Sequence, residues 1–134
     1  MNADSIGKQM IPILKEMGYR KRRLTWFRQL NETTIVFNIQ KSQYSCDTWY
    51  YQFGIGINSL AGEKINSISQ CDIICRFDQS VSGKLLQADD LKWILLRWSE
   101  KYGSIDQLRS TAREGTLPQI TTIRAKKYLL AQNK

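Results

Sequence analysis

The sequence predicts an α+β fold: a four-stranded antiparallel sheet with an N-terminal helix and three C-terminal helices packed mainly on one of its faces. Two patterns indicate this class. Apolar residues recur at every second position through the middle of the chain, as in strands with one buried face. Toward both ends they recur at every third or fourth position, as in amphipathic helices. The chain has 134 residues and no repeat or low-complexity linker, so one domain over residues 1–134 is expected.

The first helix is expected near the N-terminus. Its apolar residues are spaced by three or four positions and therefore share one helix face: Ile6, Met10, Ile13, Leu14 and Met17. Gly18 is a typical helix end, and Pro12 is a site where the helix could kink.

Four strands are expected next, and their short connections favour an antiparallel meander. The first covers residues 20–30 and ends at an Asn31-Glu32 turn, and the second covers residues 34–40. The third shows the clearest alternation, with five apolar residues at odd positions: Trp49, Tyr51, Phe53, Ile55 and Ile57. The fourth repeats the pattern at Cys71, Ile73, Cys75 and Phe77. The odd-numbered side chains are predicted to face the core, which leaves the even-numbered face open.

Three helices are predicted after the strands. The first is capped by Asp89 or Asp90 and stops at Gly103. The second starts at Ser104, where the spacing resembles a capping box, and the last is capped by Thr116. In the last helix Arg124 and Lys127 are expected on a solvated outer face.

No segment has the pattern of a secretion signal or a membrane span. The first ten residues lack a basic region followed by an apolar run, and nowhere are 18 consecutive residues apolar. The three cysteines, Cys46, Cys71 and Cys75, are too few for a disulfide framework, as is typical of a reducing compartment. We expect a cytoplasmic protein without membrane contacts.

The residue types give little support to catalysis. The chain has no histidine, the side chain best suited to proton transfer near neutrality and the commonest metal ligand. Asp72 and Asp78 alternate outward on a strand, while Asp89 and Asp90 lie at a helix start, so solvated and capping roles are expected. The sequence favours a protein that is not an enzyme, although an enzyme using Arg, Lys, Tyr or Asp stays open.

Two further motifs are read as structural, and no cofactor or metal is expected. Cys71 and Cys75 lie about 13 Å apart along a strand, too far for one metal ion. They are interpreted as buried core thiols. Gly54 and Gly56 lie inside a strand with no helix start behind them, which indicates a bulge or bend rather than a phosphate-binding loop.

The positive charges suggest where a partner binds. The net charge is +8, which favours acidic partners, and the densest run is Arg20 to Arg23 followed by Arg28. Alternation in one strand would place Arg20, Arg22 and Arg28 on one side and Lys21 and Arg23 on the other. A solvated strand end that prevents strand pairing is the alternative interpretation. Together with residues near the open sheet face, the candidate partner-binding residues are Arg20, Arg22, Arg23, Arg28, Gln40, Lys41, Tyr44 and Tyr50.

Four segments of the first half, LKEMGYRKRR (14–23), TWFRQL (25–30), IVFNIQKSQYS (35–45) and YYQFGIGIN (50–58), are similar to a family of small bacterial proteins. It is the domain of unknown function family 4304. The resemblance implies a cytoplasmic bacterial α+β domain and carries over no catalytic residues.

Two functions follow from these observations. The first is a non-catalytic binding protein, specifically an immunity-type inhibitor that neutralises a partner protein toxin. Nuclease toxins are usually basic, so the partner surface is expected to be less basic than the rest of the chain or to use its acidic residues. The alternative is nucleic-acid binding through the basic strand and the terminal helix, with affinity that falls steeply with salt.

Overall fold

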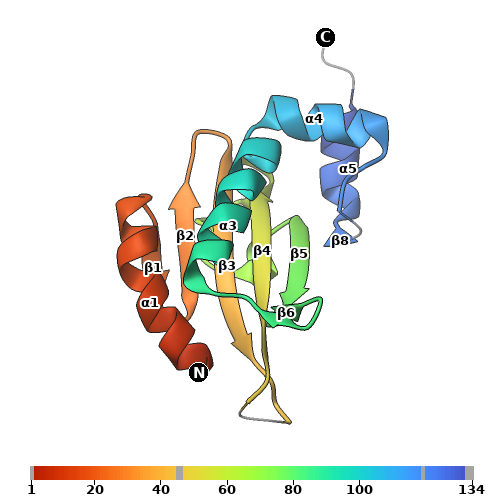
Figure 1. Cartoon of the computed structure of the whole chain (residues 1–134). Coiled ribbons are helices and arrows are strands. Elements are labelled where there is room, and N and C mark those ends of the chain that lie inside the picture. Colours follow the sequence, from red (N-terminus) through yellow and green to blue (C-terminus); the bar gives the residue numbers. More distant parts are fainter. Residues whose placement is uncertain (1, 45–46, 119, 132–134) are drawn as a thin grey trace.

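The computed structural model describes residues 2–44, 47–118 and 120–131, so Cys46 lies outside the described residues. One antiparallel sheet of six strands organises the molecule (Figure 1), in the order β1-β2-β3-β4-β5-β8. Its strands are β1 (Arg20–Arg22), β2 (Thr25–Gln29), β3 (Thr33–Lys41), β4 (Trp49–Ile57), β5 (Ile73–Asp78) and β8 (Ile120–Thr121). A small separate hairpin pairs β6 (Ser80–Val81) with β7 (Lys84–Leu85). The antiparallel meander is confirmed from β1 to β5, but the expected number of four strands is wrong.

Residues 20–30 form a hairpin rather than the single strand predicted. The chain reverses after Arg22 because Arg23 adopts a left-handed backbone conformation with φ 55°. Its two arms pair with Arg20 opposite Phe27 and Arg22 opposite Thr25. Glycine and asparagine are the usual residues in such turns. The Arg23-Leu24 sequence therefore does not indicate a turn at this position.

The expected helices are present at both ends of the chain: α1 (Ala3–Glu16), α3 (Ala88–Tyr102), α4 (Ile105–Glu114) and α5 (Ile123–Leu130). Two short elements, α2 (Asn58–Ala61) and the 3-10 turn η1 (Ile68–Gln70), were not predicted. Asn2 caps α1 by accepting a hydrogen bond from the Ser5 N–H at 2.9 Å. A capping box formed by Gln87 and Asp90 starts α3.

The last helix begins later than predicted. Thr122 caps α5, whereas Thr116 was expected to cap it. The reason is tertiary: Ile120 and Thr121 pair with β5 and become the edge strand β8. Sequence periodicity could not distinguish these two residues from a first helical turn.

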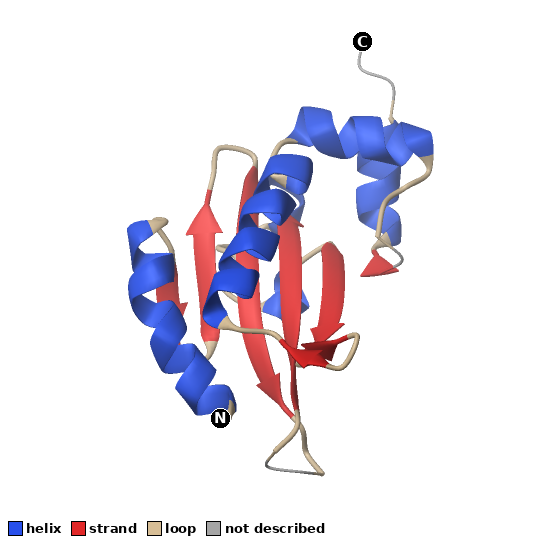
Figure 2. Cartoon of the chain, viewed as in Figure 1, coloured by secondary structure: helices blue, strands red, loops and turns tan. Residues whose placement is uncertain are grey.

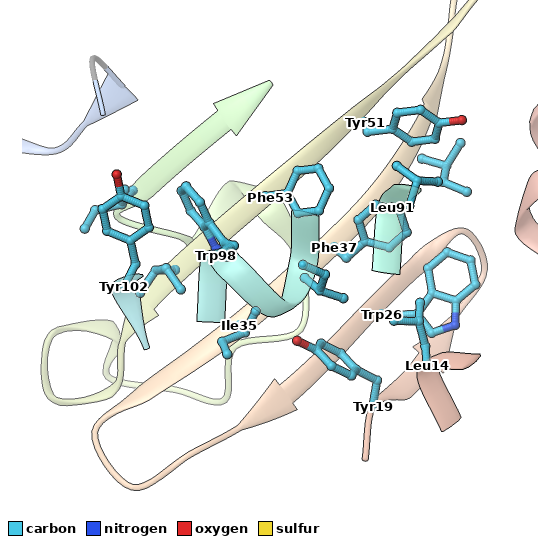
Figure 3. Close-up of a cluster of buried hydrophobic side chains, with 14 of the residues drawn as sticks. Leu14, Tyr19, Trp26, Ile35, Phe37, Tyr51, Phe53, Leu91, Trp98 and Tyr102 are labelled. Atoms are coloured by element: carbon cyan, nitrogen blue, oxygen red, sulfur yellow. The ribbon is translucent and has the colours of Figure 1, made fainter. Parts of the chain in front are cut away.

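The predicted core face of the sheet is confirmed. Helices α1 and α3 lie across it, with α3 in front of β3 and β4, while α4 and α5 continue the core beyond β5 (Figure 2). The odd-numbered residues of β4 are all buried. Figure 3 shows the aromatic centre of this core, where the Phe37 and Phe53 rings lie 5.1 Å apart and Trp98 of α3 packs over Phe53.

The opposite face, formed by the even-numbered residues of β3, β4 and β5, is only half open. Residues 61–71, hereafter the covering segment, pack Ile65 and Cys71 against Val36 and make a second small core. The prediction of an open face is therefore wrong for this half. Cys71 belongs to this second core, whereas Cys75 pairs with Phe53 on the other face, so the two thiols do not share a face as predicted.

Two glycines make room for the covering segment. A Cβ at Gly54 would lie 2.6 Å from the Cys71 Sγ, and a Cβ at Gly56 would collide with the end of the Ile65 side chain. The β3–β4 register runs without interruption through both glycines, so they serve close packing between layers rather than the bulge or bend that was expected.

Candidate functional site

The uncovered half of the even-numbered face carries polar side chains on five strands. We call it the polar sheet surface; its members are Arg22, Thr25, Asn38, Gln40, Tyr50, Gln52, Arg76 and Asp78. Asn38 Nδ2 donates to Thr25 Oγ1 at 2.8 Å, and Gln52 Nε2 donates to Asn38 Oδ1 at 3.1 Å. Arg76 donates to Gln52 Oε1 at 3.4 Å. One hydrogen-bonded row thus crosses β2 to β5.

A second row holds an aromatic ring in a fixed position. Tyr50 lies between Gln40 and Asp78 in the register of β3, β4 and β5. The Arg76 guanidinium lies 4.7 Å from the centroid of the Tyr50 ring, a cation–π contact. Arg76 is therefore held by both Gln52 and Tyr50, and one face of the Tyr50 ring is taken.

The basic hairpin does not present its arginines as predicted. Paired residues of neighbouring strands share a face, so Arg20 and Arg22 lie on the even-numbered face with Phe27. Arg28 is opposite Ile35 and lies on the core-facing side, because the unpredicted turn at Arg23 shifts the alternation. The predicted grouping of all three arginines on one side is wrong.

The other predicted residues fall in separate places. Gln40 and Tyr50 belong to the polar sheet surface. Lys41 points to the opposite face, where its Nζ lies 2.9 Å from Asp4 Oδ1 of α1. Tyr44, in the β3–β4 connection, is 95% exposed. The structure thus does not join the predicted set into one site, although Lys41 and Tyr44 line one hollow and Arg20 and Arg28 line another.

The most exposed tryptophan was missed by the sequence reasoning. Trp93 of α3 is 65% exposed. It lies two positions after Leu91 and two before Leu95, about 200° around the helix from each of these buried residues. An aromatic residue on the polar face of an amphipathic helix was the signal that could have revealed it.

Shallow hollows flank Trp93 on both sides. One, of about 510 Å³, is lined by Trp93, Leu96, Arg97, Glu100 and Lys101. The other, of about 480 Å³, is lined by Leu86, Asp90, Trp93, Ile94 and Arg97. A third, of about 540 Å³, continues past Asp90 to Val81 of the β6–β7 hairpin. We call the surface formed by Leu86, Asp89, Asp90, Trp93, Leu96, Arg97, Glu100 and Lys101 the Trp93 ridge.

Comparison with known proteins assigns the chain to a family. A family model described as Domain of unknown function (DUF4304) matches residues 10–122. The chain belongs to this family. The DUF4304 match contains every strand of the sheet and the whole of α3, and it ends at Thr122, the cap of α5. No curated protein and no solved structure matches the chain.

An ion pair between a buried aspartate and a half-exposed arginine anchors the end of the DUF4304 region. Asp72 was predicted to be solvated, but it is 1% exposed, and Arg124 Nε lies 2.7 Å from its Oδ1. Thr122 Oγ1 donates to the same oxygen at 2.8 Å, and the Ile57 N–H donates to Oδ2 at 3.3 Å. The Arg124 side chain stays 49% exposed, as expected for an outer face, but it also pairs with Asp72. This cluster joins α5 to β4 and β5.

The basic hairpin and the terminal helix lie at opposite sides of the sheet. β1 forms one edge, whereas β8, which leads into α5, forms the other. Five strand spacings separate the two edges, about 24 Å. The two basic elements of the nucleic-acid alternative therefore lie at opposite edges of the sheet.

The buried Cys71 thiol has no sign of reactivity. Burial, with a smaller effect of the Asp72 charge, raises the pKa of the Cys71 thiol to about 12, so this thiol is protonated and unreactive near neutrality. Within the described residues, no group of three or more Cys, Asp or Glu side chains lies close enough together to hold a metal ion. In the same ranges no helix has the length and apolar character needed to cross a membrane.

Proposed function

We propose that the protein is a non-catalytic bacterial protein-binding domain that docks its partner on the Trp93 ridge. In the specific form of this proposal, it acts in the cytoplasm as an immunity-type inhibitor and the partner is a protein toxin. The observation that carries the proposal is the 65% exposure of Trp93 between two hollows.

An exposed tryptophan beside an arginine has the composition of an interface hot spot. Tryptophan, tyrosine and arginine dominate the binding energy of protein interfaces, and their effect is largest where a partner excludes water around them. Trp93 and Arg97 are one helical turn apart and line the same two hollows. Partner side chains that fill these hollows would bury both.

The charge of the ridge fits a basic partner better than the rest of the surface does. The three hollows along the ridge are lined by three acidic residues, Asp89, Asp90 and Glu100, and by three cations, Lys84, Arg97 and Lys101, so their charges balance. The whole chain has a net charge of +8 and would repel a basic protein elsewhere. A less basic docking surface is what the toxin-inhibitor hypothesis requires.

The polar sheet surface is less suited to this role. Its amides bond to one another, and the Tyr50 ring is stacked by Arg76. Single-stranded nucleic acids are bound on sheets through free aromatic faces. Phe27, the other ring on this face, packs into the second core beneath the covering segment, which also weighs against base stacking.

The test is co-purification with the product of the adjacent gene, followed by titration of the complex. The Trp93→Ala variant is expected to weaken binding by at least about 30-fold, the effect of losing about 2 kcal/mol at a hot spot. Tyr44→Ala is the matched control because it removes another exposed aromatic ring, which lines none of the hollows beside Trp93, and it should bind normally. Growth protection against the toxin should follow the same order.

Three results would overturn the proposal. The first is normal binding by Trp93→Ala together with loss of binding by Tyr44→Ala. The second is a symmetric dimer, measured by light scattering, that Trp93→Ala dissolves, since the ridge would then serve a second copy of the chain. The third is salt-sensitive retention of nucleic acid in a filter assay that depends on Trp93.

A further inference from the structure

A small hollow at the β1–β2 edge brings together cations from three segments. It measures about 260 Å³ and is lined by Gly18, Arg20, Phe27, Arg28, Gln29 and Lys64. Arg20 comes from β1, Arg28 from β2 and Lys64 from the covering segment. The covering segment therefore completes a hollow whose other lining residues lie in the hairpin and just before it.

Arg28 reaches this hollow beside Gly18. Arg28 starts on the core-facing side of β2, but beside it the chain between α1 and β1 passes through Gly18 with φ 90°. A Cβ at Gly18 would lie 3.5 Å from the Arg28 Nε, so the arginine side chain lies along the glycine. The guanidinium of Arg28 can thus serve the same space as Arg20, which extends from the other face.

The lining is entirely neutral or positive. No acidic side chain borders the hollow, and within the described residues none of its three cations forms an ion pair. Three like charges around one space repel one another, and an anion between them removes that repulsion. The two guanidinium groups supply the forked donors that phosphate oxygens accept, and the Gln29 amide adds another donor.

The size of the hollow sets the size of the ligand. Pockets for drug-sized molecules hold roughly 300–1,000 Å³, so a hollow of about 260 Å³ is large enough for one phosphate group but small for a whole drug-sized ligand. We infer that Arg20, Arg28 and Lys64 form a binding site for a phosphate oxyanion. The source of the phosphate is a free or small-molecule phosphate, or the backbone of a nucleic acid. This site shares no residue with the Trp93 ridge, so its test does not depend on the proposed function.

The test is a titration of the full chain with sodium phosphate, followed by NMR of backbone amides and arginine side chains. Sodium chloride at matched ionic strength serves as the reference. Saturable shifts are expected at Arg20, Arg28 and Lys64 with phosphate and not with chloride. The double variant Arg20→Gln/Arg28→Gln is expected to weaken phosphate binding at least tenfold, and Lys64→Gln to weaken it several-fold.

A charge-matched control separates a site from a general charge effect. Arg113→Gln/Lys126→Gln removes two exposed cations from α4 and α5 and should leave phosphate binding unchanged. Equal losses in both double variants would overturn the site, as would shifts that do not saturate. Thermal unfolding of every variant checks that the fold is retained.

A competition experiment then identifies the source of the phosphate. If a single-stranded 12-mer displaces phosphate from the wild type, and binds the Arg20→Gln/Arg28→Gln variant much more weakly, the site holds a nucleic-acid backbone. If phosphate binds and the 12-mer does not displace it, the site serves a small phosphate ligand. Binding of the 12-mer with equal affinity to the wild type and the variant, without phosphate binding, would refute the oxyanion site.

Discussion

The two halves of the even-numbered sheet face differ in chemistry, although the same strands form both. The covered half carries Val36 and the paired glycines, and the covering segment seals it with Ile65 and Cys71. The open half carries hydrogen-bonded amides and the Arg76–Tyr50 pair. Side-chain size accounts for the covered half, because the glycines leave room for a second layer. In the next row Gln52 is buried by its neighbours, and Arg76 beside it stays exposed. The alternation of a strand therefore predicts which side chains share a face of the sheet. Whether another segment covers that face can differ from one part of the strand to the next.

The largest expected difference in unfolding free energy is between variants of two aspartates near β5, Asp72 and Asp78. Asp72→Ala removes the acceptor for Arg124, Thr122 and the Ile57 N–H. Arg124 is half exposed and stays hydrated, so the loss of about 3 kcal/mol of unfolding free energy that we expect comes mainly from the donors left without an acceptor. Asp78→Ala, on the open half, should change it by less than about 0.5 kcal/mol. Urea unfolding of both variants measures the difference. Equal effects would mean that the Asp72 cluster does not hold α5 to the sheet.

The next effect concerns the space beneath the covering segment. Gly56→Ala puts a methyl group against the Ile65 side chain and is expected to cost about 2 kcal/mol. Shortening the partner in Ile65→Val should recover part of this loss, although that change alone costs about 1 kcal/mol. Gln40→Ala, on the open half, should cost less than about 0.5 kcal/mol. Strict additivity of the two core changes in a double-mutant cycle would argue against their contact.

The smallest effect is a pH dependence to which the covered half contributes through Cys71. Burial raises the pKa of Cys71 from 9.0 to about 12, so between these values the folded state keeps a proton that the unfolded state loses. The stabilisation is complete below pH 9 and is lost as the pH rises toward 12. At pH 10 the loss is roughly 1.4 kcal/mol.

Cysteine variants isolate this contribution. Cys71→Ala should flatten the fall in urea-unfolding free energy between pH 8.5 and 10. Burial also raises the pKa of the half-buried Cys75, so Cys75→Ala is the control and should flatten it less. Measurements stay below pH 10 because burial also raises the pKa of Tyr19 from 10.0 to about 12, which adds the same sign of dependence above pH 10. An unchanged slope in Cys71→Ala would contradict the burial of its thiol.

The candidate site was only partly predictable. Alternation correctly placed Gln40 and Tyr50 on the even-numbered face, because neighbouring side chains of a strand must point to opposite sides. It misplaced Arg28, since a turn at a non-glycine residue has no marker in the sequence. Lys64 joins Arg20 and Arg28 only after the covering segment folds back, and no spacing along the chain shows that approach.

The sequence by itself determined the elements whose pattern is local: the α1, α3 and α4 stripes, the alternation of β3 to β5, and the family. Tertiary structure decided what depends on distant partners. β8 forms because Ile120 and Thr121 find the free edge of β5, and Asp72 is buried because Arg124, 52 positions later, supplies the opposite charge. Periodicity predicts which face of a helix or strand is apolar. Which other element covers that face depends on packing between segments that are distant in the sequence.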